Sequence, residues 1–121
     1  MEIKDLLKHR VSSPKYKTSV FADKHYGLNY NGKTIISAHR HPSISGFLIL
    51  FDDCTNSIVN YETYFKLAAN LPSIEESISG LNSYLADKDA NATFQLSSAA
   101  ISHLHTIIEA LNDNKLTEDK L

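Results

Sequence analysis

Two pairs of histidines, each separated by one residue, carry the most obvious chemical potential in this 121-residue sequence. On a β-strand His39 and His41 share a face, so both imidazoles can bind one metal ion. On a helix His103 and His105 point about 200° apart and cannot chelate together. A metal site at His39 and His41 needs a third ligand, and no spacing nominates one. The preferred interpretation places both at a strand end beside Pro42, with no metal and no cofactor.

The densest polar run is Asp52-Asp53-Cys54-Thr55-Asn56. Two adjacent carboxylates can hold Mg²⁺ or act as acid and base. The same residue types are those that hairpin loops favour, and a structural loop is the preferred interpretation. The flanking negative charge disfavours the thiolate that a nucleophilic Cys54 would need. A small enzyme using His39, His41 and Asp52 or Asp53 is therefore the least favoured hypothesis, and we predict no catalytic residue.

Charge is divided unevenly along the chain. Residues 1–41 contain eight Lys/Arg and three Asp/Glu, whereas residues 42–121 contain four and eleven. A protein with charge of both signs can present a basic surface to one partner and an acidic surface to another. This pattern indicates binding without identifying a ligand.

The first functional hypothesis is a small non-enzymatic binding protein that masks a macromolecular partner. Toxin-neutralising immunity proteins and phage anti-defence inhibitors are analogies at the level of class. The acidic part of the chain suits a basic partner such as a toxin or nuclease, and exposed aromatic side chains would anchor it. The predicted partner-binding residues are Glu75, Glu76, Asp87, Asp89, Tyr61 and Tyr64.

The alternative is a nucleic-acid or small-ligand binder that uses a basic β-face. Basic groups interleaved with aromatic rings suit single-stranded nucleic acid, although the chain has only two arginines and a pI near 6.3. The structural alternative, which needs no ligand, is a strand face exposed to solvent. The residues of this predicted face are Lys17, Lys33, Arg40, His39, His41 and Tyr30.

Strand patterns dominate the first half of the chain, after a short helix predicted over residues 1–10. Residues 17–30 alternate, and Asn31-Gly32 predicts a two-residue hairpin turn. That turn would place Leu28 opposite Ile35 and Asp23 opposite Arg40. The run 47–51 is apolar on both faces, as in a central strand, and residues 58–67 are predicted as the next strand, with a helix as the competing interpretation.

Helical patterns dominate the last third of the chain. Ser73 and Glu76 form a capping-box pattern for a helix reaching about residue 86. Ser97 or Ser98 is expected to cap a final helix that ends at residues 112–114, after a short edge strand at 93–96. Residues 115–121 are predicted to fray.

These elements predict one α+β domain over residues 1–121. It consists of an antiparallel meander of about four strands, a short N-terminal helix, and two C-terminal helices packed on one face of the sheet. The central strand is apolar on both faces, so both faces must be buried. Because a second copy of the chain could bury one of them, a homodimer is a further prediction. No signal peptide or membrane-spanning run is recognised, and the single cysteine excludes an internal disulfide, so we expect a reduced, cytoplasmic protein.

Overall fold

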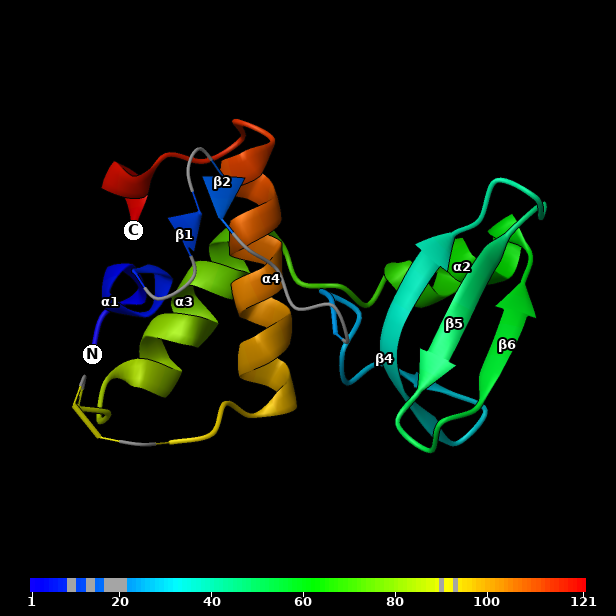
Figure 1. Cartoon of the computed structure of the whole chain (residues 1–121), viewed down its shortest axis with the longest axis horizontal. Helices are drawn as coiled ribbons and strands as arrows, with labels where there is room; N and C mark the ends of the chain where they lie inside the picture. The colour runs from blue at the N-terminus through cyan, green and yellow to red at the C-terminus, as the bar shows by residue number, and fades with distance from the viewer. Residues whose placement is uncertain (9–10, 13–14, 17–21, 90, 93) are drawn as a thin grey trace.

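The computed structural model describes residues 1–8, 11–12, 15–16, 22–89, 91–92 and 94–121. The predictions for Lys17 and for strand residues 17–21 lie outside these residues. The chain has an α+β fold, as predicted, and Figure 1 shows its elements. The helices are α1 (Ile3–Leu7), α2 (Tyr61–Ala68), α3 (Ile74–Leu85), α4 (Ser98–Asn112) and the 3₁₀ helix η1 (Glu118–Lys120); the strands are β1 (Val11–Ser12), β2 (Lys15–Tyr16), β3 (Asn29–Tyr30), β4 (Lys33–Arg40), β5 (Phe47–Phe51) and β6 (Asn56–Val59).

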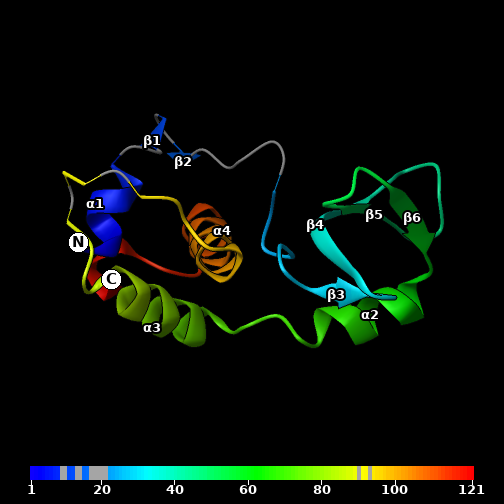
Figure 2. The ribbon, with the colours of Figure 1, turned by 90° about the horizontal axis from the view of Figure 1, so that it is seen from below.

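The elements are arranged in two halves that lie side by side (Figures 1 and 2). The helical half contains α1, α3 and α4, and the sheet half contains β3 to β6 with α2. Each half buries its own apolar core, with Leu81 and Leu104 in the first and Ile35 and Ile49 in the second. No helix in the described part of the chain is long and apolar enough to span a membrane.

The sheet is an antiparallel meander in the order β3-β4-β5-β6. Asn31 and Gly32 both have positive φ, at 51° and 80°, which confirms the predicted hairpin turn. The strand before this turn was predicted too long: β3 holds only Asn29–Tyr30, because residues 24–27 form turns and Gly27 has φ 96°.

The expected pairing of Asp23 with Arg40 is also wrong. The Asp23 carboxylate accepts the Ala38 N–H at 3.1 Å, and the Arg40 guanidinium lies 5.7 Å from the centre of the Tyr61 ring. The turn before β3 moves Asp23 off the strand register on which the prediction depended.

The predicted strand 58–67 is a second correction. β6 ends at Val59, and α2 begins two residues later because the Asn60 side chain accepts the Thr63 N–H at 2.8 Å. Tyr64 and Leu67 are three residues apart and both buried against the sheet, which a helix achieves and a strand cannot. The competing helical interpretation is therefore correct from Tyr61 onward, whereas residues 58–59 form the end of a strand, as predicted.

The two C-terminal helices do not pack on the sheet. α3 and α4 pack on each other and on α1, while α2 covers one face of the sheet (Figure 2). The predicted caps are confirmed, since Ser73 Oγ accepts the Glu76 N–H and Ser97 Oγ accepts the Ala100 N–H. Residues 94–97 form no strand. In the C-terminal segment, Leu116 and Leu121 pack against the helical core.

Candidate functional site

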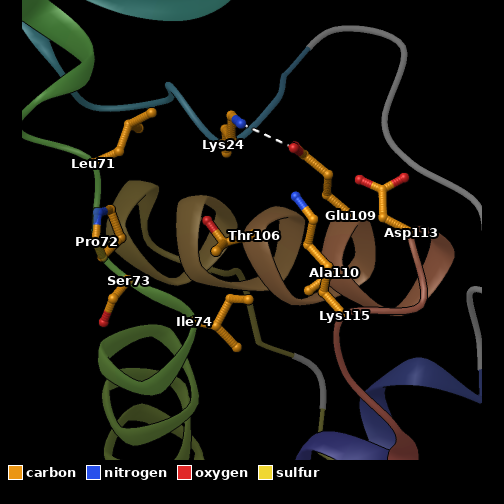
Figure 3. A pocket seen from close by; sticks show the side chains of 10 residues that line it. All are labelled: Lys24, Leu71, Pro72, Ser73, Ile74, Thr106, Glu109, Ala110, Asp113 and Lys115. Atoms are coloured by element: carbon orange, nitrogen blue, oxygen red, sulfur yellow. Dashed lines mark hydrogen bonds and ion pairs between the residues drawn. The ribbon is translucent and has the colours of Figure 1, made fainter.

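A cleft with charged and apolar walls lies where the helical half meets the connections to the sheet half (Figure 3). Its volume is about 220 Å³. Leu71, Pro72, Ile74 and Ala110 supply apolar surface. The charged side chains that line it are Lys24, Glu109, Asp113 and Lys115.

Antiparallel packing of α3 on α4 determines which acidic residues meet at this cleft. Ser77 Oγ lies 3.3 Å from His103 Nδ1, and the Tyr84 hydroxyl donates to the Gln95 carbonyl at 2.8 Å. The first turn of α3 therefore lies beside the middle of α4, and the last turn of α4 lies beside Leu71, Pro72 and Ile74. Four carboxylates consequently share one end of the helical half: Glu75, Glu76, Glu109 and Asp113.

A second, wider groove begins at the same place. Ile74 and Lys115 line both hollows, and the wider one, of about 770 Å³, continues along α3 past Glu75 and Ile78 to Asn82. Asp113 thus lines the cleft, Glu75 lines the wider groove, and Lys115 lines both. We call the cleft with Glu75, Glu76, Glu109 and Asp113 the acidic end.

The structure divides the predicted acidic face between distant places. Asp87 and Asp89 follow the C-terminus of α3, roughly 18 Å from its first turn for a helix of 12 residues. Asp87 lies 3.6 Å from Lys88 in an ion pair, and Asp89 accepts the Asn91 N–H. Of the predicted acidic residues, the structure brings only Glu75 and Glu76 to the acidic end.

The two predicted aromatic anchors lie in the other half, on α2. Tyr64 is buried, with its ring stacked 3.6 Å from that of Phe47. Tyr61 is half-buried beneath Arg40. The exposed ring on α2 belongs to Phe65, so neither predicted tyrosine offers an exposed anchor.

The predicted basic face is spread along β4. Lys33 and Tyr30 lie at one end of the strand and Arg40 at the other, roughly 23 Å away for eight residues. Lys33 is already paired, with Nζ 3.2 Å from Asp53 and 2.8 Å from the Thr55 hydroxyl. Residues 22–68 contain four basic and four acidic residues, so the sheet half has no basic excess.

The histidines and the aspartate loop do not meet. His39 Nε2 lies 3.1 Å from Ser37 Oγ, and His41 follows β4 and accepts the Ser43 N–H. Asp52 lies at the opposite end of the β4–β5 hairpin, where its N–H donates to Thr34. Within the described ranges, no three His, Cys, Asp or Glu residues are grouped to hold a metal ion.

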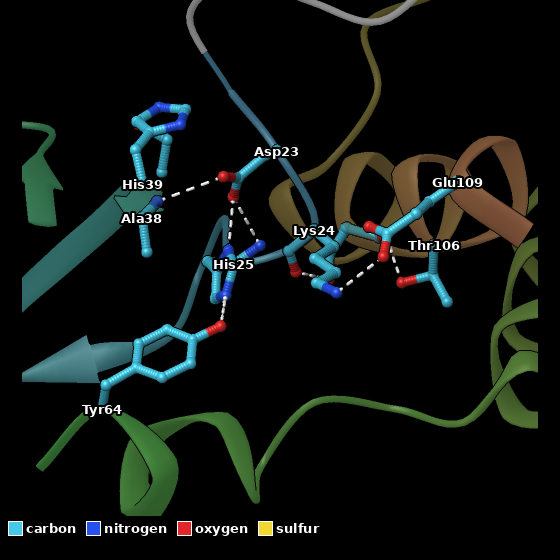
Figure 4. Close-up of polar contacts among 10 residues, drawn as sticks. Asp23, Lys24, His25, Ala38, His39, Tyr64, Thr106 and Glu109 are labelled. Atoms are coloured by element: carbon cyan, nitrogen blue, oxygen red, sulfur yellow. Dashed lines mark hydrogen bonds and ion pairs between the residues drawn. The ribbon is translucent and has the colours of Figure 1, made fainter. Parts of the chain in front are cut away.

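A hydrogen-bonded network around His25 was missed by the sequence analysis (Figure 4). Asp23 Oδ1 lies 2.8 Å from His25 Nδ1, and His25 Nε2 lies 2.8 Å from the Tyr64 hydroxyl. Because an ionised carboxylate only accepts, Nδ1 of a neutral ring carries the hydrogen and Nε2 accepts from Tyr64. The one available signal was the alternation predicted for residues 17–30, which puts Asp23 and His25, two residues apart, on the same strand face.

Burial and hydrogen bonding have opposite effects on the pKa of Asp23 in this network. Burial raises the pKa of Asp23, but hydrogen bonds from His25 and from the Ala38 N–H outweigh it, so the net pKa lies below the ordinary value of 3.8. Burial raises the pKa of the Tyr64 phenol above 10.0. The network is therefore most stable with Asp23 ionised and Tyr64 neutral.

Lys24, between these two residues, binds the helical half. Its carbonyl accepts the Ser102 hydroxyl at 2.6 Å, and its Nζ lies 2.9 Å from Glu109 Oε1 (Figure 4). The three-residue segment Asp23–His25 thus joins the halves, with alternate side chains directed to each. Through Lys24, this segment also forms one wall of the acidic end.

No protein-family model, curated protein or solved structure matches this chain.

Proposed function

We propose that this protein is a non-enzymatic binding protein that masks a basic protein partner, and that the acidic end is its contact surface. The observation that carries this proposal is a cleft with aliphatic walls that Glu109 and Asp113 line, with Glu75 lining the adjoining groove and Glu76 next to it on α3. Charge complementarity of this kind speeds association and selects the partner.

The distribution of charge favours the part of the helical half that holds α3 and α4 as the binding region. Residues 69–121 contain eight acidic and three basic residues, whereas residues 1–21 contain two acidic and five basic residues and the sheet half is balanced. Glu75 and Glu76 are exposed and form no ion pair with another described residue. Their charge is therefore available to a partner, unlike that of Lys33.

The cleft suits one long basic side chain of the partner. Its volume of about 220 Å³ is below the roughly 300–1,000 Å³ of pockets for drug-sized ligands. Leu71, Pro72 and Ile74 can pack against the methylene groups of an arginine or lysine. The carboxylates of Asp113 and Glu109 would then receive the charged head, with Glu109 shared with Lys24.

Charge reversal at the acidic end tests the proposal. Tagged wild-type protein and the variant Glu75→Lys/Glu76→Lys/Asp113→Lys are used to capture partners from native lysate, with and without nuclease, and the bound proteins are quantified by mass spectrometry. We expect the wild type to retain one basic protein near stoichiometry after nuclease treatment. The triple variant should lose at least nine-tenths of it.

The matched control reverses charge at the far end of α3. Asp87→Lys/Asp89→Lys also adds positive charge to the helical half but lies away from the cleft, so capture should be retained. Equal loss in both variants would show a general charge effect and contradict the contact surface. Full capture by the triple variant would overturn the acidic end as the site.

The nuclease arm separates masking from the alternative of nucleic-acid binding. If captured proteins disappear with nuclease and nucleic acid is recovered, the basic groups of the chain are the functional ones. Lys33→Glu/Arg40→Glu would then reduce recovery while the acidic-end variant would not.

A further inference from the structure

We propose that β6 is a self-association edge, at which a second copy of this chain adds its own β6 in antiparallel orientation and continues the sheet across a two-fold axis. The contact lies in the sheet half and is separate from the acidic end.

The backbone of β6 has hydrogen-bonding groups directed away from the sheet. The Phe51 N–H donates to the Thr55 carbonyl at 3.0 Å, so this is a hydrogen-bonded pair of the β5–β6 ladder. Such pairs alternate along antiparallel strands, which makes Ser57 and Val59 the next residues bonded to β5. The N–H and C=O groups of Asn56 and Ile58 therefore point outward. No strand of the described part of the chain lies beyond β6.

The outward backbone groups of β6 are arranged so that they can pair with the same groups of a second copy. If Ser57 lies opposite its own copy, Asn56 of each chain faces Ile58 of the other, and each such pair exchanges two backbone hydrogen bonds. A two-fold axis through Ser57 thus satisfies both outward residues on both chains.

The side chains beside this edge favour an uncharged partner. Ile58 is 62% exposed on the face of the sheet opposite α2, and no helix or strand of the described residues covers that face (Figures 1 and 2). Register places Leu48 and His39 beside Ile58, and Leu50 and Ser37 beside Asn56. None of these residues is Asp, Glu, Lys or Arg.

A second copy fits this surface better than the basic partner proposed above. Edge strands are usually protected by short length, lysine, proline or a bulge; β6 has only four residues, but Asn56–Val59 contain no lysine, proline or bulge. Two uncharged copies do not repel each other, whereas a basic partner would find no carboxylate on this face. The exposed Ile58 side chains would meet diagonally across the junction and be withdrawn from water.

Sedimentation equilibrium of the full chain over a concentration series tests this proposal. The wild type should approach twice the 13.5-kDa chain mass as concentration rises. Ile58→Lys places two positive charges near the two-fold axis and should weaken association at least tenfold. The matched control is Phe65→Lys, because Phe65 is equally exposed, at 62%, but lies on α2. It should associate like the wild type.

Two further measurements keep the proposal open to refutation. An equimolar mixture of Ile58→Lys and Ile58→Glu should recover association that neither variant shows alone, because opposite charges then meet at the axis. Amide exchange of Asn56 and Ile58 should slow as the wild-type concentration rises. A wild-type chain that stays monomeric at several hundred micromolar would overturn the proposal. So would association that is lost in Phe65→Lys and kept in Ile58→Lys.

Discussion

The helical half and the sheet half of this protein bury different kinds of side chain and leave different kinds of surface. The fully buried core of the helical half is aliphatic, whereas every contact between two aromatic rings found in the described residues involves the sheet half. Among the described residues, the two large apolar side chains with high exposure, Ile58 and Phe65, also belong to the sheet half. The helical half closes its own core and presents charge, while the sheet half leaves apolar surface and an open strand edge.

The junction between these halves is largely polar. Asp23 and His25 bind the sheet half, and Lys24 binds α4. Hydrogen bonds and a partly exposed ion pair contribute less than core burial, so each half should respond chiefly to changes in its own core.

The largest effects on stability should come from truncating a single buried side chain in the core of one half. Leu104→Ala in the helical half and Ile49→Ala in the sheet half each remove a side chain that is at most 1% exposed and should cost about 3 kcal/mol. Hydrogen exchange resolved by peptide should show roughly hundredfold faster opening in α3 and α4 for Leu104→Ala, and in β4 and β5 for Ile49→Ala. Equal acceleration in both halves for either variant would show that they unfold as one unit.

Removing the Asp23 charge should have the next largest effect, and it should depend on pH. Asp23→Asn weakens hydrogen bonds from His25 and the Ala38 N–H and should cost about 2 kcal/mol at pH 7. Because the pKa of Asp23 is lower in the folded state, its contribution is complete above the unfolded value of about 3.8 and is lost as pH falls through the folded value.

Urea unfolding at a series of pH values checks this sign. Wild type and Asp23→Asn should converge in stability once the pH falls below the lowered pKa of folded Asp23, because the carboxyl is then protonated in both states. A difference that grows on acidification would contradict the assignment of Asp23 as the ionised partner of His25.

Tyr64→Phe should have a smaller effect, confined to the sheet half. The ring and its stacking on Phe47 remain, but His25 Nε2 loses its hydroxyl partner, which should cost about 1.5 kcal/mol. Thermal unfolding followed by circular dichroism measures this loss. Tyr61→Phe is the control, since no described hydrogen bond involves the Tyr61 hydroxyl, and it should change stability by less than about 0.5 kcal/mol.

The smallest effect should come from the ion pair across the junction. Lys24 and Glu109 side chains are 30% and 50% exposed, so their coupling in a double-mutant cycle with alanine should be below about 1 kcal/mol. It should decrease further in 1 M salt. Coupling of several kcal/mol would mean that the halves are joined more strongly than their polar junction indicates.

Local signals in the sequence determined much of this fold. The Asn31-Gly32 turn, the caps at Ser73 and Ser97, and the apolar spacing of α1, α3 and α4 all predicted elements that the structure confirms. These features depend on neighbouring residues: a turn requires positive φ, a cap requires an acceptor three residues before an N–H, and a helix requires an apolar stripe.

Tertiary structure decided what local patterns leave open. Residues 61–67 satisfy both the strand and the helix period, and burial of Tyr64 and Leu67 in the core of the sheet half selects the helix that the Asn60 cap begins. Whether α3 and α4 cover the sheet or each other depends on contacts distant in sequence. The same contacts bring Ile74 at the start of α3 beside Glu109 and Asp113, leave Asp87 and Asp89 at the other end of α3, and bring together Asp23, His25 and Tyr64. Residue types and their spacing do not predict these tertiary contacts directly, because the contacts form only when segments that are distant in sequence pack together.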